Sequence, residues 1–206
     1  MAATGNTEAL RRAPSQARSR ERVEKMLAAA RDLIAEKGSD ALRMGEVAER
    51  AGVSIGSLYQ FFPDKAAVIR TLAERYNAEG RACIADGLAG IADKAGLRTA
   101  FAALIDTYYG IFLAEPVMRD IWSGTQADPA LRDLDRADSR INGAVLAEVM
   151  ARCRPEADRA ALEASAFLVM QLGEATMRLA ISVDRAEGDR LVETYKRMAL
   201  AEIAGV

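Results

Sequence analysis

The segment Gly52-Val53-Ser54-Ile55-Gly56 has the G-x-S-x-G pattern that surrounds the nucleophilic serine of α/β-hydrolases. That chemistry requires a strand before the serine, a helix after it and a histidine as the base. Here the residues before Gly52 have helical spacing, and the chain contains no histidine. The absence of histidine also removes the commonest metal ligand and general base. We therefore expect no enzymatic activity, no metal site and no cofactor.

The same segment instead predicts a helix-turn-helix over residues 43–62. Gly52 can take the left-handed conformation that a tight turn needs, and Ser54 can cap the second helix. Three apolar residues fall on one side of that helix: Ile55, Leu58 and Phe62. Small and polar residues fall on the other side: Gly56, Ser57, Tyr59 and Gln60. This is the layout of a helix that enters the major groove of DNA.

Residues 48–62 together with Lys65 resemble the DNA-binding signature of the tetracycline-repressor (TetR) family of bacterial transcription regulators. Residues 28–38 resemble that family's first helix, and the whole match covers roughly residues 20 to 66. The resemblance implies that Ser57 and Gln60 contact base edges and that Tyr59 and Lys65 hold phosphates. The complete set that we expect to contact DNA is Arg18, Arg20, Arg43, Met44, Ser54, Ile55, Gly56, Ser57, Tyr59, Gln60 and Lys65.

Two positions in this segment leave alternatives open. The family usually has a threonine where this chain has Leu42 and Arg43, so the cap of the first helix of the motif must come from elsewhere, such as Asp40 or water. Gly56 costs roughly 1 kcal/mol relative to alanine in a helix. Either a close approach to DNA or tight packing on the preceding helix would explain this glycine, and we favour DNA.

The remaining sequence predicts an all-α protein with about nine helices, because no segment shows the period-two alternation of a strand. We expect a flexible basic arm over residues 1–18 and a first helix that begins after Ser19. The helix-turn-helix domain covers residues 19–66, and a helical bundle for ligand binding and dimerisation covers residues 67–206. The two last helices are expected over residues 156–183 and 186–204.

The resemblance implies that the two last helices form the interface of a homodimer. A two-fold protein also suits a palindromic operator, since one short helix reads few base pairs. We predict that the interface contains Leu162, Ala166, Val169, Gly173, Met177, Ala180, Leu191, Tyr195 and Met198. The alternative is that these stripes face the core of the protomer.

The resemblance also implies a pocket for a small-molecule effector among the middle helices, where large side chains gather. The predicted lining residues are Phe101, Tyr108, Tyr109, Phe112, Met118, Trp122, Met170, Gln171 and Glu174. Their spacing is equally that of an ordinary helical core. Three arginines would suit an anionic ligand, although surface positions are their more ordinary place: Arg119, Arg140 and Arg178.

Composition limits the partners and the setting. The net charge is −2, yet residues 1–65 carry eleven Lys and Arg against nine Asp and Glu, so the excess of positive charge lies at the DNA-binding end. No apolar run approaches the roughly 20 residues of a membrane span, and two cysteines give no disulfide framework. We expect a cytoplasmic protein that does not contact the membrane.

These observations together predict a ligand-responsive regulator that represses transcription as a homodimer on a palindromic operator. An activator of the same fold would have the same sequence features. A helical binding protein without DNA activity is the other alternative, and it should be insensitive to replacement of Tyr59 and Lys65.

Overall fold

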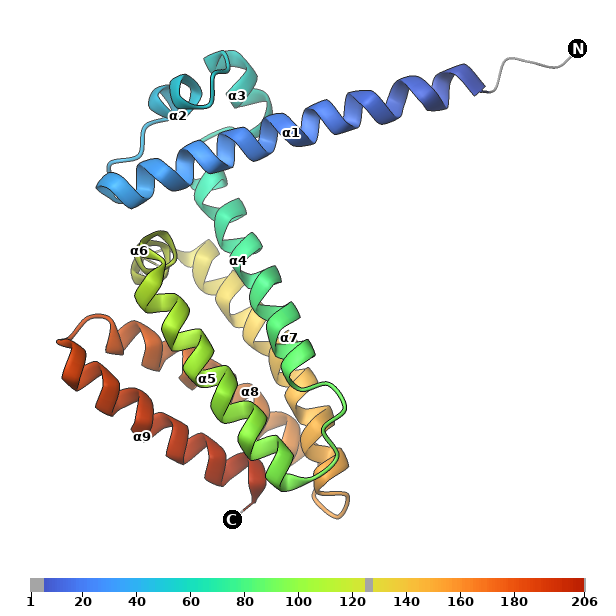
Figure 1. Ribbon diagram of the computed structural model, residues 1–206, viewed down its shortest axis with the longest axis vertical. Helices are drawn as coiled ribbons and strands as arrows, with labels where there is room; N and C mark the ends of the chain where they lie inside the picture. The colour runs from blue at the N-terminus through green and yellow to red at the C-terminus, as the bar shows by residue number, and fades with distance from the viewer. Residues whose placement is uncertain (1–5, 125–127, 206) are drawn as a thin grey trace, which may run out of the picture. The chain divides into compact units, whose positions relative to one another are not determined.

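The computed structural model describes residues 6–124 and 128–205, with side chains described from residue 18 onward. Over these residues the chain forms nine α-helices and no strand (Figure 1). The predicted all-α fold is confirmed. The packing divides the chain into two compact units, the first ending at Leu72 and the second beginning at Ala73. This boundary lies inside helix α4 (Lys65–Gly87), rather than after residue 66 as the sequence suggested.

The first unit contains three helices followed by the first turns of α4. Its helices are α1 (Asn6–Lys37), α2 (Met44–Arg50) and α3 (Ile55–Phe61). Their shared core contains fully buried apolar side chains from each helix: Met26, Leu27, Ala30, Val47 and Leu58. Burying each of the larger of these side chains contributes about 1.5–3 kcal/mol to stability. This core therefore holds the three helices together.

The start of α1 differs from the prediction. The helix begins at Asn6 and not after Ser19, so residues 6–18 of the expected flexible arm are helical, while residues 1–5 lie outside the described part. The prediction gave too much weight to Pro14 and to small polar residues. The other residues of 6–18 include Ala, Leu, Glu, Gln and Arg, which all favour a helix.

Two glycines end helices in the first unit. Gly38 ends α1 with φ of 83°, and Gly52 follows α2 with φ of 66°, the left-handed conformation predicted for it, which other residues rarely adopt. Ion pairs also connect α2 to α1. Arg50 makes a two-pronged contact with Glu36 at 2.5 and 2.9 Å, and Lys37 pairs with Glu46. These pairs are exposed and contribute little, so the apolar core remains the main stabilising element.

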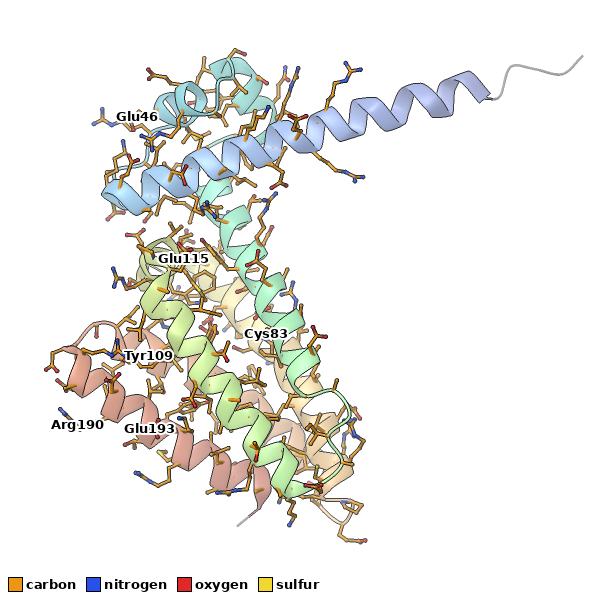
Figure 2. The ribbon with its side chains drawn as sticks, in the orientation of Figure 1. Glu46, Cys83, Tyr109, Glu115, Arg190 and Glu193 are labelled. Atoms are coloured by element: carbon orange, nitrogen blue, oxygen red, sulfur yellow. The ribbon has the colours of Figure 1, made fainter. Side chains whose placement is uncertain are left out.

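The second unit is a bundle formed by the rest of α4 and five further helices. They are α5 (Lys94–Ala114), α6 (Pro116–Gly124), α7 (Pro129–Cys153), α8 (Arg159–Ala180) and α9 (Arg185–Ala204). Helix α8 packs against both α7 and α9, and α9 also packs against α5. Charged side chains such as Arg190 and Glu193 lie on the solvent side of α9 (Figure 2). No helix in the described ranges is long and apolar enough to cross a membrane.

Aspartate side chains set the starts of the bundle helices. Asp93, Asp128, Asp158 and Asp184 each accept a hydrogen bond from a backbone amide in the first turn that follows. Helix α7 begins with Pro129, directly after its cap Asp128, and proline is well suited to this first helical position. Helix α8 begins at Arg159 rather than at residue 156, because Asp158 takes the capping position, and it ends at Ala180 rather than at 183.

Candidate DNA-binding surface and effector pocket

The exposed face of α3 is the first candidate site. Ser54 caps the helix by accepting a hydrogen bond from the Ser57 amide at 3.2 Å, as predicted. Leu58 and Phe62 turn inward and are buried. The residues at positions one, two, five and six of the helix face solvent together: Ile55, Gly56, Tyr59 and Gln60. Tyr59 keeps 50% of its surface exposed, so its ring and hydroxyl are available to a partner.

Ile55 is a correction within this helix. The helical wheel grouped it with the buried Leu58 and Phe62, but its side chain is 44% exposed. It occupies the first turn of a seven-residue helix, where the packing of α1 and α2 leaves much of its side chain open to solvent. Ile55 therefore belongs to the exposed face, where the list of expected DNA contacts also placed it.

The structure distinguishes the two explanations of Gly56. A Cβ atom added at this position would have no heavy atom within 4 Å, so packing inside the first unit does not require a glycine here. The helix nevertheless bears the cost of glycine, roughly 1 kcal/mol. Tight packing on the preceding helix therefore does not explain this glycine.

The other expected DNA contacts surround α3 in the sequence. Arg18 and Arg20 on α1 are exposed, as is Arg43, whereas Met44 and Ser57 are half-buried. Arg43 occupies the N-cap position of α2 with no capping hydrogen bond from its side chain, and Asp40 does not cap α2 either. Lys65 is half-buried, and its Nζ donates to the Asp40 carbonyl at 3.1 Å. Lys65 thus links the start of α4 to the loop before α2.

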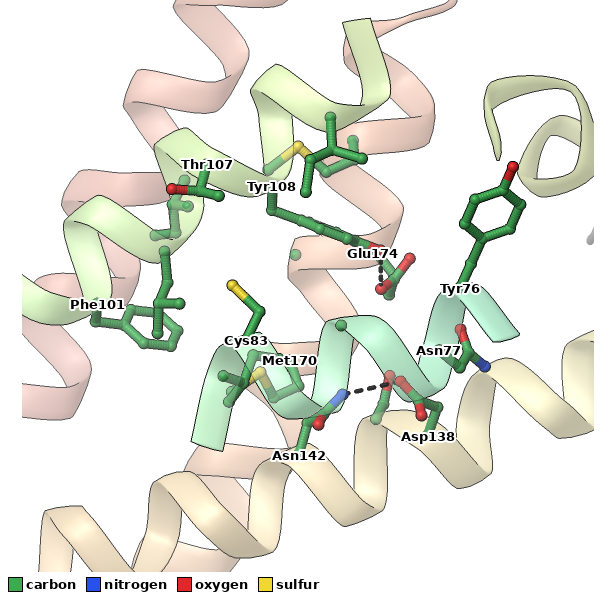
Figure 3. Close-up of a pocket in the computed structure, with 18 of the residues that line it drawn as sticks. Tyr76, Asn77, Cys83, Phe101, Thr107, Tyr108, Asp138, Asn142, Met170 and Glu174 are labelled. Atoms are coloured by element: carbon green, nitrogen blue, oxygen red, sulfur yellow. Dashed lines mark hydrogen bonds between the residues drawn. The ribbon is translucent and has the colours of Figure 1, made fainter. Parts of the chain in front are cut away.

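A cavity of about 90 Å³ inside the second unit is the second candidate site. Helices α4, α5, α6, α7, α8 and α9 all contribute to its wall, as Figure 3 shows for the labelled residues. Most of the wall is apolar or aromatic: Ile84, Phe101, Leu104, Ile105, Ile111, Met118, Met170 and Met177. Polar groups converge on one region of the wall: Asn77, Tyr108, Asp138, Asn142 and Glu174. Such a combination is typical of a small-molecule site.

Glu174 is the central polar group of the cavity. Its two oxygens accept hydrogen bonds from the Tyr108 hydroxyl and, at 3.0 Å, from the Trp122 indole nitrogen. Burial raises the pKa of Glu174 to about 7, and the nearby Asp135 carboxylate adds to that rise. The same burial, together with Glu174, holds the pKa of the Tyr108 hydroxyl well above its usual value. The site therefore contains a carboxyl group that is poorly stabilised as an anion.

Asp138 is the second carboxylate of the wall. It forms an ion pair with Arg81 on α4 and accepts a hydrogen bond from the Asn142 amide at 2.8 Å (Figure 3). Burial raises its pKa in spite of these partners. Asp135, one turn earlier on α7, pairs with Arg178 at 3.5 Å. Within the described side chains, no three carboxylates or cysteines lie where they could hold a metal ion.

Five of the nine predicted effector residues line this cavity: Phe101, Tyr108, Met118, Met170 and Glu174. The other four do not line it. Tyr109 turns toward α9 and donates to Asp189 at 3.0 Å, and Gln171 donates to Asp135 at 3.2 Å. Phe112 is fully buried core. Trp122 lines a smaller adjoining pocket and reaches the cavity only through Glu174.

The sequence analysis missed the α4 and α7 walls. Asn77, Gly80 and Cys83 on α4, and Asp138 and Asn142 on α7, all line the cavity. One signal was present in the sequence: Asp138 and Asn142 lie four residues apart and therefore share one face of the helix. The structure shows that both side chains are buried. A polar pair at a position where the apolar stripe is expected indicates a buried polar site.

Most of the predicted dimer residues, which lie on α8 and α9, belong to the core of the protomer. Seven of the nine are buried there: Leu162, Ala166, Val169, Gly173, Met177, Ala180 and Tyr195. The space above Gly173 is filled by the Tyr195 hydroxyl of the same chain, which also donates to the Val169 carbonyl at 2.7 Å. Leu191 is half-buried and Met198 is 60% exposed.

Comparison with known proteins identifies the family. Residues 95–204, more than half of the chain, match the model of the tetracyclin repressor-like C-terminal domain. Residues 26–72 match the model of bacterial regulatory proteins of the tetR family. The chain therefore belongs to the TetR family, and membership makes it a DNA-binding transcriptional regulator. This family is not enzymatic, in agreement with the rejected hydrolase interpretation.

Individual relatives are distant or match only locally. An HTH-type transcriptional regulator of Bacillus subtilis, YdeS, is 50% identical over 44 residues, which are 21% of this chain and 22% of YdeS. The regulator SCO7518 of Streptomyces coelicolor A3(2) is 23% identical over 90% of this chain and 99% of its own, with a TM-score of 0.69. FadR of Bacillus subtilis, solved with stearoyl-CoA, is 15% identical over 89% and 98%, with a TM-score of 0.62. The two structural likenesses establish the shared fold.

Proposed function

We propose that this protein is a repressor that binds a palindromic operator as a homodimer in the cytoplasm and is released by a small-molecule effector. The observation that carries the DNA-binding part is the exposed face of α3. Its residues Ile55, Gly56, Tyr59 and Gln60 face solvent, and Gly56 has open space above it. A backbone that is open at this point allows a phosphate or a base edge to approach closely. Tyr59 then holds the backbone of the DNA, and Gln60 contacts a base.

The second copy of the chain would pack on the exposed apolar side chains of α8 and α9. Leu168, Leu172 and Leu179 on α8 are 56, 43 and 51% exposed, and they recur at helical spacing on the side away from the core. Met198 adds an exposed apolar side chain on α9. Residues of this size rarely form an uncovered stripe on a monomer. In this proposal, dimerisation uses these leucines instead of the buried stripe.

The effector would occupy the cavity of the second unit and act through α4. Asn77, Gly80 and Ile84 in the later turns of α4 line the cavity, and Val68 in an earlier turn is buried in the first unit. A ligand shifts an equilibrium only when it binds one arrangement more tightly than the other. A ligand that prefers a displaced α4 would alter the spacing of the two α3 helices, which has to suit half-sites roughly 34–36 Å apart.

The decisive experiment is a mobility-shift titration with DNA from upstream of the gene, at two salt concentrations. The wild-type protein is expected to bind with an affinity that falls steeply with salt. Tyr59→Ala should weaken binding, whereas Arg190→Ala, a change on exposed α9, should leave it intact. Transcript levels in a deletion strain separate the modes of action, since loss of a repressor raises transcription of its target. Salt-insensitive binding, or equal binding by Tyr59→Ala, would contradict the proposal.

A further inference from the structure

Around the proposed effector cavity, negatively charged groups outnumber positively charged groups. Two carboxylates, Asp138 and Glu174, belong to its wall, and none of the described residues of that wall is a lysine or an arginine. The neighbouring guanidinium groups already have carboxylate partners, Arg81 with Asp138 and Arg178 with Asp135. Counted with Asp135, three carboxylates face two guanidinium groups. The fully ionised cluster therefore lacks one positive charge.

Among these three carboxylates, Glu174 has the weakest compensation by a positive charge. Its two hydrogen-bond donors, Tyr108 and Trp122, are neutral, and the closest cation is Arg178 Nη1 at 3.9 Å from Oε2. That guanidinium lies nearer to Asp135, at 3.5 Å. The raised pKa of Glu174 follows from its burial and from the neighbouring Asp135 carboxylate, which together outweigh the attraction of the shared Arg178 guanidinium. A cation that entered the cavity would allow the carboxylate to ionise.

Asn77 is a buried polar side chain that borders both the cavity and the smaller pocket beside Trp122. Its side chain lines the cavity and is only 7% exposed, yet its amide nitrogen Nδ2 has no hydrogen-bond partner. A buried amide without a partner costs about 1–3 kcal/mol, and such groups are uncommon in native proteins. A ligand oxygen at this point would satisfy the nitrogen. Asn77 and Asp138 lie on facing helices, α4 and α7, in the same part of the cavity (Figure 3).

The remainder of the wall suits an apolar or aromatic body. Phe101, Ile105, Met118 and Met170 offer hydrophobic surface, and the thioethers of the methionines adapt to irregular shapes. Tyr108, whose hydroxyl reaches Glu174, also presents an aromatic ring to the cavity. Aromatic rings attract cations through their faces. The wall therefore combines hydrophobic surface with groups that favour positive charge.

We propose that the effector is a lipophilic amine: its protonated nitrogen binds between Glu174 and Asp138, a neutral oxygen close to that nitrogen accepts from Asn77, and its apolar body lies against Phe101 and Met170. This assignment rests on the proposed effector function of the cavity. None of the three arginines that would suit an anionic ligand lines the cavity. Arg119 is on the surface, Arg140 stacks on the Phe167 ring at 4.4 Å, and Arg178 is paired with Asp135. An acyl anion would meet two carboxylates and no free cation of the wall.

Three probes of one chain length test the charge preference: decylamine, decanol and decanoate, each below its micelle concentration and at neutral pH. Trp122 is the only tryptophan of the chain and donates to Glu174, so its fluorescence reports occupancy of the site. Decylamine is expected to bind about tenfold more tightly than decanol, and decanoate the most weakly. Glu174→Gln should reduce the amine-to-alcohol ratio by about tenfold. Glu163→Gln, a change on the exposed side of the same helix, is the matched control.

A second pair of probes tests Asn77. An amino alcohol of the same length should bind the wild type more tightly than decylamine does, and Asn77→Leu should remove that difference. Equal affinities across the charge series, tighter binding of decanoate, or no binding of the amine would overturn the assignment. Operator release is measured separately. Release of the operator by decanoate alone would support the effector function of the cavity and overturn its assignment to an amine. Binding of decylamine without release of the operator would support the amine site and overturn the effector function.

Discussion

The indole nitrogen of Trp122 lies 3.0 Å from Glu174 Oε2 and donates a hydrogen bond that joins α6 to α8. The Trp122 ring meets Tyr76 of α4 edge-on at 6.1 Å and Phe112 of α5 at 6.4 Å. A single carboxyl group is thus connected, through one aromatic side chain, to α4 and α5. Any ligand that changes the position or the ionisation of Glu174 acts on this cluster first, and α4 is the helix that continues into the DNA-binding unit.

The first prediction concerns the stability of the protein as a function of pH. Because the pKa of Glu174 is about 7 in the folded protein and 4.5 is its ordinary value, the folded state binds this proton more tightly than the unfolded state does. Stability must then fall as pH rises from about 5 to about 7, and the loss from this one group reaches up to about 3 kcal/mol. Glu174→Gln cannot ionise, so its free energy of unfolding should exceed that of the wild type increasingly over this range.

Urea unfolding of both proteins at about pH 5 and about pH 8 measures the effect. The comparison with the wild type cancels the other titrating groups, including Asp138, whose pKa is also raised. Glu148→Gln is the control, since this exposed carboxylate has a lowered pKa through its hydrogen bond with Arg159 and should show no such gain at high pH. A difference between Glu174→Gln and wild type that stays constant with pH would contradict the raised pKa.

The second prediction separates stability from DNA binding at one position of α3. Gly56→Ala should stabilise the protein by about 0.5–1 kcal/mol, because alanine favours the helix and the added Cβ meets no atom within 4 Å. The same methyl group should weaken operator binding, since it occupies the space that the DNA approaches. Thermal unfolding and a mobility-shift titration on one protein sample test both parts. Unchanged operator affinity would show that the DNA does not come close to Gly56.

The third prediction concerns the dimer. Leu172→Asp, which puts a charge on the exposed stripe of α8, should shift the protein from dimer to monomer, because a charge at the centre of an apolar interface costs several kcal/mol. Ile55→Asp places the same charge on another exposed aliphatic residue, on α3, and should leave the dimer intact. Light scattering coupled to size-exclusion chromatography measures the masses. A dimeric Leu172→Asp protein would move the interface away from this stripe.

The sequence predicted local features well and contacts between distant helices poorly. The turn at Gly52, the cap at Ser54 and the buried Leu58 depend on neighbours within a few residues, which a helical wheel captures. Helix α8 has two apolar stripes, one through Gly173 and one through Leu172. Periodicity cannot decide which stripe faces the core, because that depends on how α7 and α9 pack against it. The prediction chose the stripe of small residues, and the structure buries that stripe inside the protomer.

The same limit applies to the cavity. Asn77 and Asp138 lie 61 positions apart in the chain, and only the packing of α4 on the bundle brings them to one wall. Neither residue belongs to a motif. Phe112 and Trp122, in contrast, were expected in the pocket because large aromatic residues are scarce in this chain, and the structure uses both to build the supporting cluster around Glu174.

The last prediction tests the close contact of α7 and α8 with a matched pair of glycines. A Cβ added at Gly143 would lie 2.9 Å from the Phe167 Cα and 3.1 Å from its backbone nitrogen, so the two helices would have to separate. Backbone atoms cannot rotate away as a side chain can, and Gly143→Ala should therefore destabilise the second unit by about 1–3 kcal/mol. Gly110 on α5 has open space at its Cβ position, so Gly110→Ala should instead stabilise by about 0.5–1 kcal/mol. Urea unfolding at one protein concentration compares the stabilities of the two variants. Because α7 and α8 carry Asp138 and Glu174, Gly143→Ala should also weaken the binding of decylamine. If Gly143→Ala were as stable as wild type, the close approach of α7 and α8 would be wrong, and with it the spacing of the two carboxylates on which the amine site depends.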